Sequence, residues 1–257
     1  MARFSLSERS QAFVREIGGI VLGVLIALSL GAVATAVGWR MDAADARRAL
    51  SLELGEIIGQ GRERELANAC IEARLDKVAA AIDAAELTGR LPPLGEIGDP
   101  PWRTWSHGVW DSTISSDIAS HMDRETLDNL SGAYEFVTIL NRESAFEFES
   151  WTRLYGMVGP GRATTPAEVV DLRAALTRSR ASHRLMVLSA VRLRQIADAY
   201  DLPYDRGTVA QWANDSLARR YCAPIPPPNG KGYGQAPFSG SYRRVLQNPI
   251  LRDSTGR

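Results

Sequence analysis

One uncharged run limits what this chain can fold into more than any other feature. The 23 residues from 17 to 39 contain no Asp, Glu, Lys, Arg or His. As a helix, this run is about 34 Å long at 1.5 Å per residue, which is enough to cross a bilayer. The sequence therefore predicts a transmembrane helix at 17–39, preceded by a short tail at 1–16, with the lipid bilayer as a partner.

A secretion signal cleaved near the small residues Ala34-Thr35-Ala36 is the alternative interpretation of this run. The apolar region of a signal is usually about 7–15 residues, whereas 17 uncharged residues precede Ala34 here. Helix-forming residues also continue beyond Trp39, with no Gly or Pro before Gly55. We favour a permanent anchor that leaves the membrane as one uninterrupted helix.

The charges beside the run do not decide its orientation. Three arginines precede it and three follow it closely, at positions 3, 9, 15, 40, 47 and 48. Because the two counts are equal, the positive-inside rule favours neither side. We expect a short cytoplasmic N-terminus and a periplasmic C-terminal domain, at a bacterial inner membrane.

Small residues recur every four positions within the run. Gly19, Gly23, Ala27, Gly31 and Thr35 lie on one face of the expected helix. Such a stripe lets two membrane helices approach closely. It predicts self-association or pairing with another span, although Gly and Ala are also common in membrane helices generally.

Beyond the membrane, a seam of positions in steps of four and three runs from Leu50 to Ala85. Both ends of the seam are apolar, as in a coiled coil. Its middle, GQGRERELAN at 59–68, is polar and contains two glycines, which we interpret as a weak point or a kink in one long helix. The seam either pairs with a second copy or packs on later helices of the same chain.

The remaining sequence predicts further helices and almost no sheet. A segment rich in Pro and Gly at 88–101 ends the first helix, and new helices are expected at about 110–121, from the N-cap Asp123 to about 155, from the N-cap Thr165 to about 200, and at 207–220. We predict an all-α fold in which the transmembrane helix continues into a stalk helix of an up-and-down bundle at 40–222. A basic tail rich in Pro and Gly, extended or disordered, is expected at 223–257.

The composition argues against several chemistries. Residues 40–222 carry 22 basic and 27 acidic side chains, which disfavours nucleic-acid binding. Metal-binding, phosphate-loop and nucleophile motifs are absent from the sequence, so we expect no cofactor, metal or catalytic residue. Cys70 and Cys222 are the two cysteines, and in an oxidising periplasm we expect them to form a disulfide.

Three tryptophans, Trp102, Trp105 and Trp110, follow the Pro-rich segment. They either present a surface for a ligand or a partner protein, or fill the core where a loop crosses the helices.

Several short stretches resemble an uncharacterised family of bacterial single-pass membrane proteins. They are Glu16-Ile17, GVLIAL at 23–28, CIEARLDKVAAAI at 70–82, the PP…W…W…W-D stretch ending at Asp111, and HMDRE at 121–125. The resemblance covers residues 16–155 and implies an anchor and a helical extramembrane domain, with no known activity.

These observations predict a membrane-anchored helical interaction or scaffold protein of the cell envelope that is not an enzyme. The alternatives are an envelope sensor with a Trp-lined ligand site, and an unrecognised hydrolase.

Overall fold

The computed structural model describes residues 8–213 and residue 222. Within these residues it contains five α-helices: α1 (Glu8–Thr88), α2 (Gly108–Ser115), α3 (Arg124–Leu154), α4 (Pro166–Ala199) and α5 (Arg206–Trp212). Two short 3-10 helices, η1 (Asp117–His121) and η2 (Tyr155–Met157), follow α2 and α3. The strands β1 (Arg90–Leu91) and β2 (Arg162–Ala163) form one antiparallel pair, with Arg90 opposite Ala163. The all-α prediction is confirmed.

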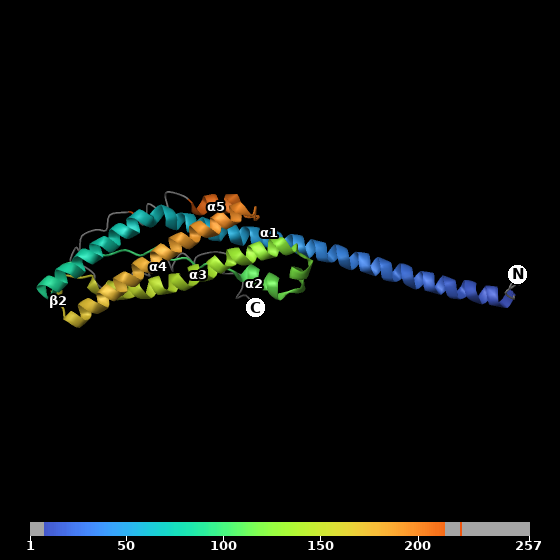
Figure 1. Cartoon of the computed structure of the whole chain (residues 1–257), viewed down its shortest axis with the longest axis horizontal. Helices are drawn as coiled ribbons and strands as arrows, with labels where there is room; N and C mark the ends of the chain where they lie inside the picture. The colour runs from blue at the N-terminus through green and yellow to red at the C-terminus, as the bar shows by residue number, and fades with distance from the viewer. Residues whose placement is uncertain (1–7, 214–221, 223–257) are drawn as a thin grey trace, which may run out of the picture.

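The first part of α1 projects from the body of the molecule (Figure 1). Every side chain from residue 15 to residue 37 is exposed, although this stretch is strongly apolar. In the described part of the chain, this is the one segment that is long and apolar enough to cross a membrane. The segment is compatible with a single-pass membrane anchor near the N-terminus.

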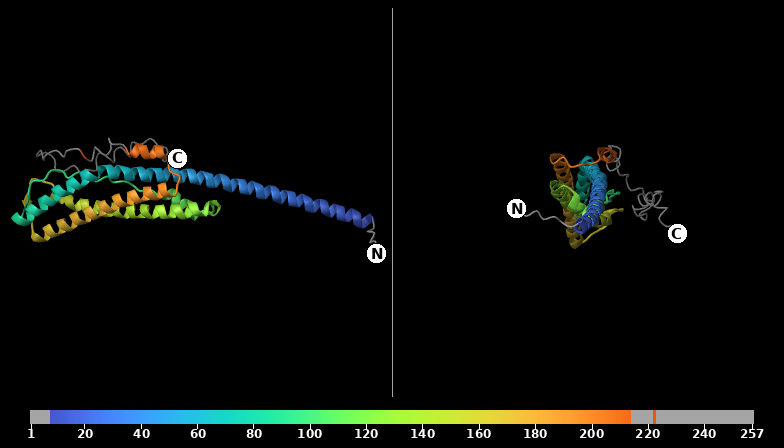
Figure 2. Two further views of the ribbon diagram at one scale, coloured as in Figure 1. Left: turned by 45° about the horizontal axis from the view of Figure 1, so that its top comes forward. Right: turned by 90° about the vertical axis from the view of Figure 1, so that its right-hand side faces the viewer.

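The second part of α1 packs along α3 and α4 to form a bundle (Figure 2). The apolar seam positions are buried against the chain's own later helices, as one of the two interpretations proposed. One long helix with a weak point or a kink at 59–68 was expected, and α1 is helical throughout this stretch. Gly61 allows close approach there, since a Cβ at this position would lie 2.8 Å from the Cβ of Ala190 on α4.

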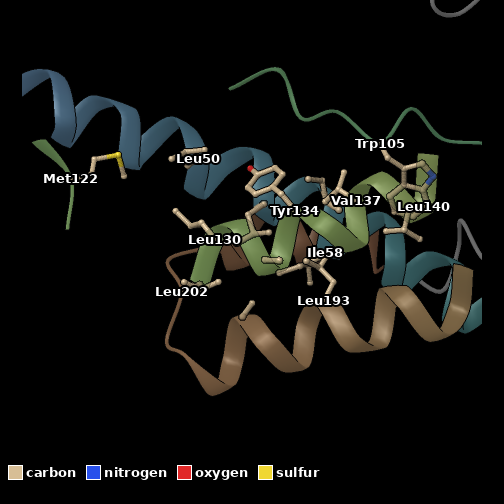
Figure 3. Packing of buried hydrophobic residues seen from close by; sticks show 14 of the residues in the cluster. Leu50, Ile58, Trp105, Met122, Leu130, Tyr134, Val137, Leu140, Leu193 and Leu202 are labelled. Carbon is tan, nitrogen blue, oxygen red and sulfur yellow. The ribbon is translucent and has the colours of Figure 1, made fainter. Parts of the chain in front are cut away.

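Two hydrophobic clusters fill the bundle. The cluster nearer the exposed part of α1 is shown in Figure 3 and includes Leu50, Ile58, Tyr134 and Leu193. The far cluster uses α1 from Ala67 onward and packs against the ends of α3 and α4 that lie near β1 and β2. Residues 59–66 of α1 lie between the two clusters.

Two of the expected helix starts are confirmed by their caps. The carboxylate of Asp123 accepts a hydrogen bond from the backbone N–H of Thr126, and the hydroxyl of Thr165 accepts one from Glu168. The helix expected at 110–121 is instead divided at Ser116, whose extended backbone separates α2 from η1. The helix expected at 207–220 is seen at 206–212; the later part of that prediction, and the tail at 223–257, lie outside the described residues.

Candidate functional site

A polar layer divides the two hydrophobic clusters. It consists of Glu63, Arg64 and Asn68 on α1, Glu147 on α3 and His183 on α4. Arg64 is 1% exposed, and Glu63 and His183 are fully buried. Buried charges are costly unless they are paired, so the contacts within this layer determine what it can do.

Arg64 is the centre of the layer. Its Nη2 atom donates to Oε1 of Glu147 across the α1–α3 interface, and its Nη1 donates to the carbonyl oxygen of Pro101 at 3.2 Å. The same Nη2 lies 3.3 Å from Nδ1 of His183 on α4. One guanidinium therefore connects three helices and the Pro-rich segment.

The contacts of His183 define its tautomer. Nε2 lies 2.8 Å from Oδ1 of Asn68, and an amide oxygen can only accept a hydrogen bond. Nε2 therefore carries the proton, and Nδ1 accepts from Arg64. Burial, followed by the positive charges of Arg64 and Arg184, lowers the pKa of His183 to about 3. The imidazole is neutral at pH 7.

Two opposing effects act on the pKa of Glu147. Burial raises the pKa of its carboxyl group, whereas the charge and the hydrogen bond of Arg64 act to lower it. Removal of Arg64 would leave this carboxyl group in a dry interface without its cation.

Glu63 connects α1 to Arg103, just after the Pro-rich segment, and through Arg103 to α5. Its two carboxylate oxygens accept from Nε and Nη2 of Arg103 at 2.8 and 2.7 Å, a bidentate pair. The Arg103 guanidinium also lies 5.1 Å from the ring centroid of Trp212 on α5. A Cβ on Gly59 would lie 2.8 Å from Cβ of Trp212, so a glycine is needed where α5 crosses α1.

A third buried carboxylate, Glu53, organises the start of α2. Its Oε1 accepts from the backbone N–H of Val109, and its Oε2 accepts from that of Trp110. These are donors that the first turn of a helix leaves unpaired, and the side chain of His107 does not cap them. The hydroxyl of Tyr134 also donates to Glu53 at 2.8 Å, and burial together with this bond raises the pKa of Tyr134.

The polar layer is suited to holding helices in register rather than to chemistry. Its imidazole is neutral and bonded at both nitrogens, and its carboxylates are paired with guanidinium groups. In the described part of the chain, no group of three or more His, Cys, Asp or Glu side chains is arranged to hold a metal ion.

The three tryptophans occupy three different environments. Trp105 is 1% exposed in the core, and its backbone oxygen accepts from the amide of Asn141. Trp110 is partly buried and stacks on Tyr134, with ring centroids 4.9 Å apart. Trp102 is 53% exposed and lies beside Phe148. Three hollows among the described residues are lined by other side chains.

The remaining sequence-derived sites are the small-residue stripe in the exposed part of α1 and the two cysteines. Gly19, Gly23 and Gly31 have open space around them, with no atom within 4 Å of a Cβ built at any of the three. Cys70 and Cys222 form the expected disulfide, with Cα atoms 5.1 Å apart.

Comparison with protein families, curated proteins and solved structures finds no match to this chain. The sequence interpretation did not identify the polar layer as a site. Its signal was present, because seam positions 64 and 68 are polar where a coiled-coil seam is normally apolar. Their partners Glu147 and His183 lie 83 and 115 positions further along the chain, and no local pattern pairs them with Arg64 and Asn68.

Proposed function

We propose that this protein is a membrane-anchored helical scaffold of the bacterial cell envelope, in which α1 joins a rigid body directly to the bilayer. The observation that carries the proposal is the continuity of α1. The unbroken run of exposed residues ends at Val37 and the first buried residue of the body is Ala43, with no break in the helix. The two stretches are about 9 Å apart along the axis, so the body is held close to the membrane surface.

The disulfide supports a periplasmic body. Disulfides persist in oxidising compartments such as the periplasm and are rare in the cytosol. Cys70 on α1 and Cys222, 152 positions later, enclose α2 to α5. A loop of this length corresponds to about 5 kcal/mol of stabilisation in the chain-entropy model. Such a link suits a structural protein that works outside the reducing cytosol.

A binding role is favoured over catalysis by the way that the buried charges are used. In the described residues, Arg64 binds Glu147 and the carbonyl oxygen of Pro101, and Glu63 binds Arg103. These charged groups therefore bind other parts of the same chain rather than face an open cleft. We infer that the partners of this protein meet its outer surface or its span. The open stripe of Gly19, Gly23 and Gly31 supports pairing of two spans, either in two copies or with another membrane helix.

Thiol labelling of spheroplasts tests the orientation and the disulfide together. With a membrane-impermeant maleimide, we expect the body to react only after reduction, whereas an added Ser7→Cys reports the cytoplasmic side and reacts only after lysis. Reaction of Cys70 and Cys222 without reductant would contradict the disulfide. Reaction of the reduced body only after lysis would contradict a periplasmic body.

Self-association is tested in a membrane dimerisation assay on the full-length chain. Gly23→Ile places a branched side chain on the open stripe, and we expect association to fall at least tenfold. Leu25→Ile, in the same span but on another face, is the matched control and should associate as the wild type does. Equal association of Gly23→Ile and wild type would exclude the stripe as the contact.

A further inference from the structure

A hollow lies where the exposed part of α1 meets the body. It combines small residues from the end of the apolar run with polar and aromatic residues just beyond it, and its lining consists of Ala32, Thr35, Ala36, Trp39, Arg40 and His121. His121 is the last residue of η1, and its ring stacks on Trp39 with centroids 4.3 Å apart and planes 17° apart. The α2–η1 corner of the body therefore reaches back to the last turns of the run.

The polarity of this hollow changes along its length. The lower end of the hollow is the end toward the N-terminus of α1, and its upper end is toward Arg40. Ala32 and Ala36, at the lower end, present only methyl groups and lie within the uncharged run. Arg40 lies about two turns beyond Ala32 along α1, about 12 Å away, and shares the other end of the hollow with His121. Arg40 and His121 are both exposed, and within the described residues neither is seen in an ion pair. This end thus offers a guanidinium and an imidazole to an acceptor that lies outside the described residues.

We propose that this interfacial hollow binds one glycerophospholipid of the leaflet from which α1 emerges. The lipid phosphate accepts hydrogen bonds from Arg40 and His121, and an acyl chain lies along Ala32 and Ala36. Guanidinium groups form strong charge-assisted bonds with phosphate, and basic groups at the membrane surface attract lipid headgroups. Trp39 stands at the depth where interfacial tryptophans are enriched.

A lipid fits this hollow better than a soluble anion because of where the hollow is. The inference rests on the proposed anchor: when residues 17–39 span a bilayer, the lower end of the hollow is in hydrocarbon and its upper end is among the headgroups. The occupant must then be apolar at one end and anionic at the other. The consequence is a second membrane contact, through η1, that sets the angle of the body on the bilayer.

Nitroxide depth measurements on the full-length protein in phospholipid vesicles test the placement. The native cysteines remain bonded, so a single added cysteine takes the label. We expect the Ser120→Cys label, beside His121, to show collisions with oxygen and with an aqueous nickel chelate that place it among the headgroups. A label at Leu25→Cys is the reference for a position in hydrocarbon. A label at Leu188→Cys, exposed on α4, is the reference for a position in water.

The labels separate two kinds of failure. A Leu25 label in water would overturn the anchor and the lipid site together. A Leu25 label in hydrocarbon with a Ser120 label as water-exposed as that at Leu188 would overturn the lipid site alone.

Lipid retention tests the assigned residues. Native mass spectrometry of the protein released from nanodiscs of phosphatidylglycerol and phosphatidylcholine should show one retained phospholipid on the wild type. In the double variant Arg40→Gln, His121→Gln, we expect the fraction of protein that retains a phospholipid to fall at least tenfold. Arg192→Gln, which also removes an exposed arginine but on α4, should retain it. Equal retention by wild type and double variant, or equal loss in Arg192→Gln, would overturn the assignment.

Discussion

Residues 15–37 and residues 50–85 are parts of one helix, but they meet different surroundings. Leu25 in the first stretch is 55% exposed, whereas Leu54 in the second is fully buried. Every side chain of the first stretch is exposed, and a continuous apolar surface of this size is compatible with a membrane anchor. The second stretch is stabilised by α3 and α4 of the same chain.

A second contrast lies within the buried stretch. Leu50, Leu54 and Ile58 pack among apolar side chains, but Arg64 a few residues later pairs with Glu147 and contacts His183. Apolar packing tolerates alternative registers, whereas a buried charge is stable only opposite its partner. We infer that the polar layer fixes how α1, α3 and α4 align.

Among the variants that compare the polar layer with the apolar clusters, Arg64→Met should lower the free energy of unfolding most. It leaves the Glu147 carboxyl buried without its cation, so we expect a loss of about 4 kcal/mol in the free energy of unfolding. Denaturant unfolding of the protein in detergent micelles measures it. Arg153→Met, at an exposed ion pair with Glu149, is the control and should cost less than about 1 kcal/mol.

The pH dependence of the same variant sharpens the assignment. Without Arg64, burial holds the pKa of Glu147 in the folded protein above its unfolded value, so folding binds a proton and stability falls as pH rises. The loss should be smaller at pH 5 than at pH 8, and Glu147→Leu added to Arg64→Met should restore most of the stability. An equal loss of stability at both pH values would argue against an unpaired, buried Glu147 carboxyl group as the cause.

Matched leucine truncations compare the two stretches of α1 directly. Leu54→Ala removes fully buried methyl groups and should lower the free energy of unfolding by about 3 kcal/mol. Leu25→Ala alters the exposed stretch and should leave the unfolding of the body unchanged. Similar losses in the two variants would mean that the exposed stretch contributes to the folded body.

Acid should destabilise the polar layer through His183. Its folded pKa of about 3 lies below the ordinary value near 6.5, so the unfolded chain binds a proton that the folded protein does not. The contribution of His183 to the free energy of unfolding is complete above pH 6.5. It is lost as pH falls, by about 2 kcal/mol between pH 7 and pH 5. Unfolding curves of wild type and His183→Gln measure it, and the variant should have the flatter profile. Parallel profiles would rule out His183 as the group that titrates.

The parts of the fold that local sequence could predict are those set by local physics. The Asp123 and Thr165 caps, the seam from Leu50 to Ala85 and the lack of extended sheet all follow from spacing and side-chain chemistry. The break at Ser116 did not follow from the local pattern. One long helix through 59–68 was expected, and α1 is helical through these residues. Gly59 and Gly61 usually weaken a helix, but here α4 and α5 pack against them and that contact outweighs the local preference.

The sequence by itself determined the uncharged run, the helical class of the body and the pair of cysteines available for a cross-link. These depend on composition and on spacing along the chain. Only the tertiary structure decided which helices meet the seam, which carboxylates neutralise Arg64 and Arg103, and that η1 brings His121 onto Trp39. Each of these contacts joins residues at least 40 positions apart, and their pairing depends on how whole helices pack rather than on any local pattern.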